Sequence, residues 1–291
     1  MIPLQAVTQR HQVIAVVRPK RPRIWYRRAI WPFFRGSPTG TEDSISNWAR
    51  EQGVLLLSAA SGRDLEVAAH LKRLAPDVIC VSAFPWILSR EILATARRST
   101  FNIHPSLLPR HRGPVPLFWV YFHDDRETGV TVHQMNQRPD AGDILAQQAS
   151  GLPRGFPVVR LHALNAVRGA GLLHGVLEKL ESEEIRTMKQ DERLATYAPH
   201  VSPGRGMVNF QEWQVERVWH FLAGLFPRFR EPLLDSNHKA IRYESVLGYQ
   251  AGDCSQPPGI VSQASHGWNL YCRGGSIQLG DAPAPASRTE P

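Results

Sequence analysis

Three polar side chains in two short segments could carry out acyl transfer. Asn102 and His104 stand at the end of a predicted strand, Ser99 to His104, which Pro105 stops. Asp140 stands further along the chain, before an Ala-Gly pair. An amide can donate to a developing oxyanion, an imidazole can exchange protons near neutral pH, and a carboxylate can orient the imidazole. Because ligands bind at the carboxyl ends of strands in open α/β sheets, we expect the three side chains to meet at such an edge.

Two other interpretations apply to these residues. An Asn-x-His pair is common at an ordinary strand end, where its polar groups are simply satisfied. A metal site is the second alternative, because four histidines lie in one short stretch: His104, His111, His123 and His133. Their spacings match no zinc pattern, and the three cysteines contain no Cys-x-x-Cys pair. We therefore expect no metal, and we expect Cys80 to be a core residue of an apolar strand.

The run from Pro76 to Gln148 resembles the catalytic domain of the folate-dependent formyltransferases. The matching segments are Pro76 to Val81 with Ile87-Leu88, Asn102 to Gly113, and Thr128 to Leu145. The resemblance implies a doubly wound α/β fold, 10-formyltetrahydrofolate as the formyl donor and a primary amine as the acceptor.

The same resemblance implies roles for single residues. Asn102 and His104 would stabilise the formyl oxygen, and Asp140 would orient His104 and relay the proton of the amine, without a metal or a covalent enzyme intermediate. Eight residues would contact the folate: Phe84, Ile87, Leu88, Ser106, Leu107, Leu108, Pro109 and Gly113.

The composition is that of an ordinary globular protein large enough for two domains. Of the 291 residues, 42% are hydrophobic and 21% are charged, which argues against large-scale disorder. No apolar run reaches the roughly 20 residues needed to cross a bilayer, so we expect a cytoplasmic protein. Three cysteines at no metal spacing fit a reducing compartment.

The positive charge is concentrated at the amino terminus. The net charge is +8, and residues 1 to 35 hold eight Lys or Arg and no Asp or Glu. This aromatic-rich segment could bind phosphates, could lie on a membrane surface, or could pack its rings on the domain with the arginines solvated. We predict that it binds the acceptor, with no membrane contact, through seven residues: Arg18, Lys20, Arg21, Arg23, Arg27, Arg28 and Arg35.

Helix and strand patterns alternate over residues 1 to 182, which predicts a doubly wound, mostly parallel sheet. The expected strands are His11–Val17, Val54–Leu57, Asp77–Ser82 and Ser99–His104. The expected helices are Asp43–Gln52, Arg63–Leu74, Ser89–Arg97, Pro116–Phe122 and a long helix from Val158 to Leu180.

The amino terminus departs from the family, which has a strand and a helix before the strand expected at His11–Val17. Only about ten residues precede that strand here. We therefore expect a truncated or wrongly assigned start, a missing first strand, and unpaired backbone groups beside Asp77–Ser82.

After a predicted linker at residues 183 to 200 the pattern of apolar residues in the sequence changes. A helix at Gln211–Leu225 and short apolar pieces between Gly and Pro turns predict a small barrel, similar to the oligonucleotide-binding fold, over residues 201 to 280. Its expected strands are Ala240–Tyr243, Gly259–Ser262, Trp268–Cys272 and Ser276–Leu279. We expect residues 281 to 291 to be a disordered tail.

The segment Thr196-Tyr197-Ala198-Pro199 and the domain after it resemble the methionyl-tRNA formyltransferases, which implies initiator methionyl-tRNA as the acceptor. We expect a monomer. A 4-amino sugar nucleotide is the alternative acceptor. Residues 201 to 291 hold eight basic and eight acidic side chains, whereas a tRNA-binding barrel is expected to be basic. A formyltransferase-like protein that only binds is the third hypothesis, and it would predict a broken Asn, His and Asp set.

Overall fold

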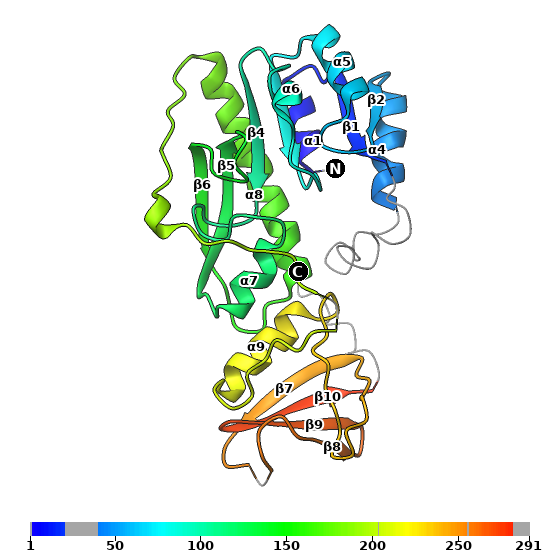
Figure 1. The fold of residues 1–291 in the computed structure, drawn as a ribbon, viewed down its shortest axis with the longest axis vertical. Helices are drawn as coiled ribbons and strands as arrows, with labels where there is room; N and C mark the ends of the chain where they lie inside the picture. The colour runs from blue at the N-terminus through cyan, green and yellow to red at the C-terminus, as the bar shows by residue number, and fades with distance from the viewer. Residues whose placement is uncertain (1, 21–39, 203, 255, 282–291) are drawn as a thin grey trace. The chain divides into compact units, whose positions relative to one another are not determined.

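The structure is a computed structural model that describes residues 2–20, 40–202, 204–254 and 256–281 (Figure 1). The chain divides into two compact units. The first comprises Met1–Val120, Glu127–Gly151 and His162–His200. The second comprises Tyr121–Arg126, Leu152–Leu161 and Val201–Pro291. The first two of these segments were predicted in the first domain and cluster with the second unit instead.

The first unit contains two sheets (Figure 1). Strands β1 (Ala15–Pro19) and β2 (Leu55–Ala59) pair in parallel. The second sheet has the order β3-β4-β5-β6. Its strands are β3 (Val78–Ser82), β4 (Ser99–His104), β5 (Glu127–Gln134) and β6 (Ile144–Gly151).

The prediction of a mostly parallel sheet is wrong for the second sheet, which is mixed. Strands β3 and β4 are parallel, whereas β5 is antiparallel to both β4 and β6. The chain returns from β5 to β6 through residues 135 to 143, a connection too short for the crossover that a parallel pair needs.

Strand β3 lies at an edge of this sheet. Among the described residues no strand pairs with its outer side, and β1 and β2 form a separate sheet. Cys80 was expected in the core and is exposed on β3. Successive side chains of a strand point to opposite faces, and it is Ile79 and Val81 that face the apolar cluster with α5 and α6.

Six helices of the described chain accompany these sheets: α1 (Ile2–Thr8), α4 (Gly40–Glu51), α5 (Leu65–Leu74), α6 (Arg90–Leu93), α7 (Pro116–Phe122) and α8 (Val158–Glu181). The helix expected at Ser89–Arg97 has only the four residues of α6. It ends early because the backbone amide of Arg97 donates to the carbonyl oxygen of Pro76.

The core of the first unit lies between the mixed sheet and α8 (Figure 1). Phe101 of β4 and Val130 and Val132 of β5 pack against apolar residues of α8, including Leu173. Burying each such side chain contributes about 1.5–3 kcal/mol. A second cluster of apolar side chains joins β2, α5 and α6 to β3. Strand β3 therefore packs against α5, the helix before it, and α6, the helix after it.

The second unit contains α9 (Val215–Leu225) and an antiparallel sheet of order β7-β10-β9-β8. The strands are β7 (Ser245–Ala251), β8 (Val261–Ala264), β9 (Gly267–Cys272) and β10 (Gly275–Gly280). The prediction of a strand at Ala240–Tyr243 is wrong. The chain instead turns back between Leu233 and Ile241, where the Ile241 amide donates to the Leu233 carbonyl oxygen and Ala240 forms an isolated bridge with Leu234. The strand β7 that follows was missed.

Helix α9 begins four residues later than predicted, because the Trp213 amide donates to the Asn209 carbonyl oxygen in a preceding turn. Within the described ranges no helix is both long and apolar enough to cross a membrane.

Candidate active site

The structure brings Asn102, His104 and Asp140 together at the carboxyl end of β4. Asn102 Nδ2 lies 3.4 Å from Asp140 Oδ1, and His104 Nδ1 lies 3.7 Å from Asp140 Oδ2. A second imidazole joins them, because β5 pairs His133 with Asn102. His133 Nε2 lies 3.1 Å from Asn102 Nδ2 and 3.4 Å from Asp140 Oδ1. One carboxylate therefore faces an amide and two imidazoles.

The backbone around Asp140 is held in an unusual conformation. Asp140 has a φ of 50°, in the left-handed region. Its Oδ2 accepts a hydrogen bond of 2.8 Å from the Gly113 amide, which joins the loop after β5 to the loop after β4. A Cβ at Gly142 would lie 1.7 Å from the Gln134 carbonyl oxygen, so this position accepts only glycine.

Burial and neighbouring charges set the protonation of the pair. Burial alone raises the pKa of Asp140, but the His104 and His133 rings and the Gly113 amide outweigh it and hold that pKa below its usual range. Burial lowers the pKa of His104, and the Asp140 charge opposes this effect. His104 Nε2 lies 2.9 Å from the His111 carbonyl oxygen, to which it donates its proton. The site therefore holds a charged carboxylate at neutral pH.

The loop after β4 is anchored by its own polar groups. Thr131 Oγ1 donates to the Ser106 carbonyl oxygen at 2.6 Å and accepts from the Leu108 amide at 3.2 Å. Gln147 Nε2 donates to the Leu108 carbonyl oxygen at 2.9 Å. These contacts to β5 and β6 fix the loop that follows His104.

The predicted folate contacts lie on two loops. Phe84, Ile87 and Leu88 follow β3, and the Phe84 ring meets Trp86 edge to face with centroids 5.5 Å apart. Ile87 is 62% exposed, whereas Leu88 is buried. The others follow β4, where Ser106 and Leu108 are buried and Leu107, Pro109 and Gly113 are half-buried. The role of all eight as folate contacts stays a prediction.

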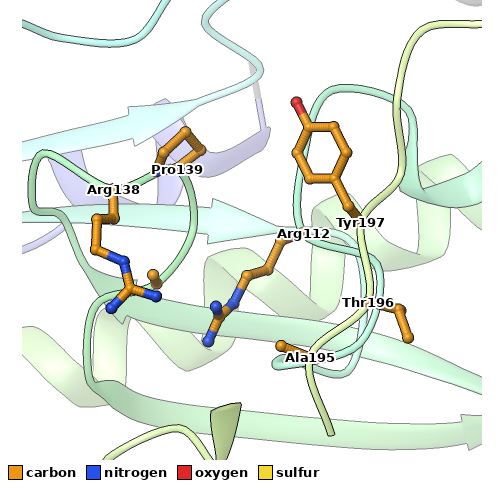
Figure 2. A pocket seen from close by; sticks show the side chains of 7 residues that line it. Arg112, Arg138, Pro139, Ala195, Thr196 and Tyr197 are labelled. Carbon is orange, nitrogen blue, oxygen red and sulfur yellow. The ribbon is translucent and has the colours of Figure 1, made fainter. Parts of the chain in front are cut away.

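A pocket of about 300 Å³ lies beside the Asp140 loop (Figure 2). Its lining residues are Arg112, Arg138, Pro139, Ala141, Ala195, Thr196 and Tyr197. The Arg112 and Arg138 side chains extend in the same direction, and the Tyr197 ring points away from them. The predicted folate contacts, all within the described chain, are not among these residues.

Sequence reasoning missed the contribution of the linker. Gln190 Nε2 donates to the carbonyl oxygens of Asp140 and Gly142 at 2.8 and 2.6 Å, and Glu192 accepts from Arg112 and Arg138. The linker backbone also pairs with the loop after β4, since the Arg112 amide donates to the Thr196 carbonyl oxygen. In the sequence, the only indication of this contribution was the position of Gln190 just before the Thr196 to Pro199 segment.

Two of the seven predicted acceptor-binding residues lie in the described chain. Arg18 of β1 donates from Nη1 to Ser46 Oγ at 2.9 Å, and Lys20 is exposed just after β1. The other five lie outside the described residues: Arg21, Arg23, Arg27, Arg28 and Arg35. Among the residues that the structure describes, no three His, Cys, Asp or Glu side chains gather as a metal site.

Comparisons with known proteins identify the family of the chain. The formyl transferase family model matches residues 5–152. The methionyl-tRNA formyltransferase of Anaeromyxobacter dehalogenans strain 2CP-C is 32% identical over 95% of this chain and 88% of its own, and that of strain 2CP-1 is 38% identical over 84% and 81%.

Solved structures share the fold. The sugar 3N-formyl transferase WlaRD, crystallised with dTDP and 5-N-formyl-THF, superposes with a TM-score of 0.68 at 14% identity, covering 96% of this chain and 92% of its own. The mixed sheet with its flanking helices is thus a Rossmann-like α/β arrangement found in formyltransferases. The chain therefore belongs to the formyl transferase family.

Proposed function

We propose that this enzyme transfers a formyl group from 10-formyltetrahydrofolate to the amino group of initiator methionyl-tRNA. The observation that carries the proposal is the identity of 32% and 38% with methionyl-tRNA formyltransferases over more than four fifths of both chains. Those matches extend beyond the catalytic domain.

The side chains at the end of β4 fit a formyl group and an amine. The Asn102 Nδ2 group lies against Asp140 Oδ1 and His133 Nε2, and the formyl oxygen would replace one of these acceptors, because an oxygen that gains negative charge requires N–H donors. The Phe84 and Trp86 rings after β3 suit a flat heteroaromatic ring.

Each residue then has one role. Asn102 donates to the formyl oxygen as the amine nitrogen bonds to the formyl carbon. His104, whose Nε2–H group keeps donating to the His111 carbonyl oxygen, adds a second donor from Nδ1 in its protonated form, and Asp140 accepts the proton that the amine loses, directly or through water. The folate nitrogen takes this proton from Asp140 as its bond to the formyl carbon breaks, so that tetrahydrofolate leaves and the formyl group remains on the amine. The steps need no metal and no covalent enzyme intermediate.

The second unit and the basic segment are assigned to acceptor binding. We infer that the four-stranded sheet and α9 belong to a barrel of the oligonucleotide-binding type covering residues 201 to 280, joined by a linker at 183 to 200 to a catalytic domain at 1 to 182. Arg18, Lys20 and the arginines up to Arg35 would contact tRNA phosphates. The enzyme would act as a cytoplasmic monomer.

Two observations favour the alternative class of acceptor, an amino-sugar nucleotide; the predicted member of this class was a 4-amino sugar, whereas WlaRD is a sugar 3N-formyl transferase. WlaRD matches nearly the whole chain in fold, and residues 201 to 291 carry equal numbers of acidic and basic side chains. A nucleotide-linked sugar would need no basic second unit.

The test is formyl transfer by the purified full-length protein, with charged initiator tRNA and a dTDP-linked amino sugar assayed side by side. Formyl-methionyl-tRNA as the preferred product supports the proposal. Preference for the sugar would contradict it, and a folded protein inactive on both would indicate a binding protein.

A further inference from the structure

A single linker side chain ties the two catalytic loops together. Gln190 Nε2 donates to the carbonyl oxygens of Asp140 and Gly142 at 2.8 and 2.6 Å. Its Oε1 accepts from Arg112 Nε at 3.0 Å and from Arg112 Nη2 at 2.8 Å. The amide thus bridges the loop after β5 and the loop after β4 at one point.

The Asp140 backbone needs such support. A φ of 50° is uncommon for a residue other than glycine and costs free energy, so the surroundings must hold it. Gln190 bonds the carbonyl oxygens of the residues on both sides of Ala141 and so fixes the first and the third peptide planes that follow the left-handed residue. The Asp140 carboxylate accepts from Gly113, the neighbour of Arg112. Gln190 and Asp140 therefore link the same two loops.

The orientation of the Gln190 amide is determined by its partners. Carbonyl oxygens only accept and a guanidinium only donates. Arg112 is itself buried, and its Nη1 donates to Glu192 at 3.0 Å. An amide serves both neighbours, whereas a carboxylate could serve only the Arg112 side.

From these contacts we infer that Gln190 is a positioning residue of the active site: it holds the Asp140 backbone so that the carboxylate faces His104, His133 and Asn102. The inference rests on the proposed formyl transfer only for its kinetic consequence.

The kinetic test is Gln190→Glu. The new carboxylate keeps the contact to Arg112 but places oxygens against the two carbonyl groups, so the Asp140 loop must shift. Because small displacements of a catalytic group are costly, we expect kcat to fall at least about tenfold. KM for 10-formyltetrahydrofolate should change by less than about threefold, since the loss falls on the chemical step.

The matched control is Gln148→Glu, the same change at an exposed position of β6, which should keep the kcat of the parent. Gln190→Met is the second variant, since it removes both contacts without adding charge. A role confined to anchoring Arg112 predicts a normal kcat for the Glu variant and a loss for the Met variant. That result would overturn the inference.

A readout independent of the acceptor is hydrogen exchange at the Gly113 amide, measured by NMR. This amide donates to Asp140 Oδ2, so it should exchange faster in both Gln190 variants than in the parent and in Gln148→Glu. Unchanged exchange would refute the positioning role even in a protein without formyl transfer. An inactive parent would instead refute the proposed function and leave the exchange result decisive for Gln190.

Discussion

Asp140 keeps its negative charge in surroundings that would favour a neutral carboxyl group. Burial raises the pKa of this group, and the contacts from His104, His133 and Gly113 reverse the effect. A buried charge needs partners that favour the charged form. The three groups therefore act as a unit, and removing one partner changes the electrostatics of the others.

At the residue scale, we predict that Asn102→Ala and His104→Ala each lower kcat about a hundredfold, because each removes a donor from the oxygen that gains charge. Folate binding should persist, since the loops that would contact the folate remain anchored through Thr131 and Gln147. Single-turnover formyl transfer and folate titration by fluorescence measure the two effects. Turnover near that of the parent in either variant would disprove the assigned roles.

At the scale of elements, the bounds predicted from the sequence were most accurate where residues close together in the chain determine them. Strand β4 and helix α7 have the predicted bounds, because prolines mark the end of one and the start of the other. The antiparallel return from β5 to β6 depends on pairing across the sheet, which no local pattern encodes. Helix α6 stopped early through hydrogen bonds to a distant loop, and β7 was missed for lack of a strong alternating pattern.

The site, too, could be predicted only where residue type and local sequence identify a residue, and not where contacts between distant segments do. Asn102, His104 and Asp140 could be singled out by residue type and by resemblance, and the structure brings them together. Gln190 could not be singled out, because its importance comes from two carbonyl oxygens and a guanidinium that are 48 to 78 positions away in sequence.

Helix α8 offers a matched pair of glycine substitutions. A Cβ at Gly169 would lie 2.4 Å from the Ile103 side chain on β4, whereas a Cβ at Gly171 has nothing within 4 Å. We predict that Gly169→Ala destabilises the protein by about 1–3 kcal/mol through overpacking. Gly171→Ala should stabilise it by about 0.5–1 kcal/mol through helix propensity. Urea unfolding measures both, and equal shifts would contradict the close packing of α8 on the sheet.

Helix α9 carries a buried histidine that should weaken the fold in mild acid. His220 Nδ1 accepts from the Gly155 amide at 2.9 Å, and its ring stacks on Tyr121. Burial, aided by the Arg154 charge, lowers the pKa of His220 to about 4. The unfolded chain takes up this proton near pH 6.5, so stability is lost as the pH falls from about 6.5 to 4, by up to about 3 kcal/mol.

The variant His220→Gln isolates that effect, since its side-chain oxygen can still accept from Gly155 but cannot titrate. The stability of the parent relative to the variant, from urea unfolding at several pH values, should decrease between pH 7 and pH 4.5. A constant difference over this range would show that His220 does not titrate in this way.

At the scale of the whole molecule, the charge is divided unequally along the chain. The first 35 residues hold eight basic side chains without an acidic one, and the rest of the chain is neutral. A polyanionic acceptor is therefore expected to depend on one segment, and its binding should fall with salt in proportion to the phosphates neutralised there.

We predict that the double variant Arg21→Ala, Arg23→Ala weakens initiator tRNA binding and lowers the slope of log K against log salt by about one to two, because two phosphate contacts are lost. The matched control removes two exposed charges of α5, Lys72 and Arg73, with the same change in net charge. Binding curves from 50 to 300 mM salt, roughly the range over which phosphate contacts dominate, measure both slopes. If the two double variants reduce the slope equally, the effect is one of overall charge and the amino-terminal segment has no specific role. If only the first does so, the tRNA phosphates contact that segment, as initiator tRNA as the acceptor requires.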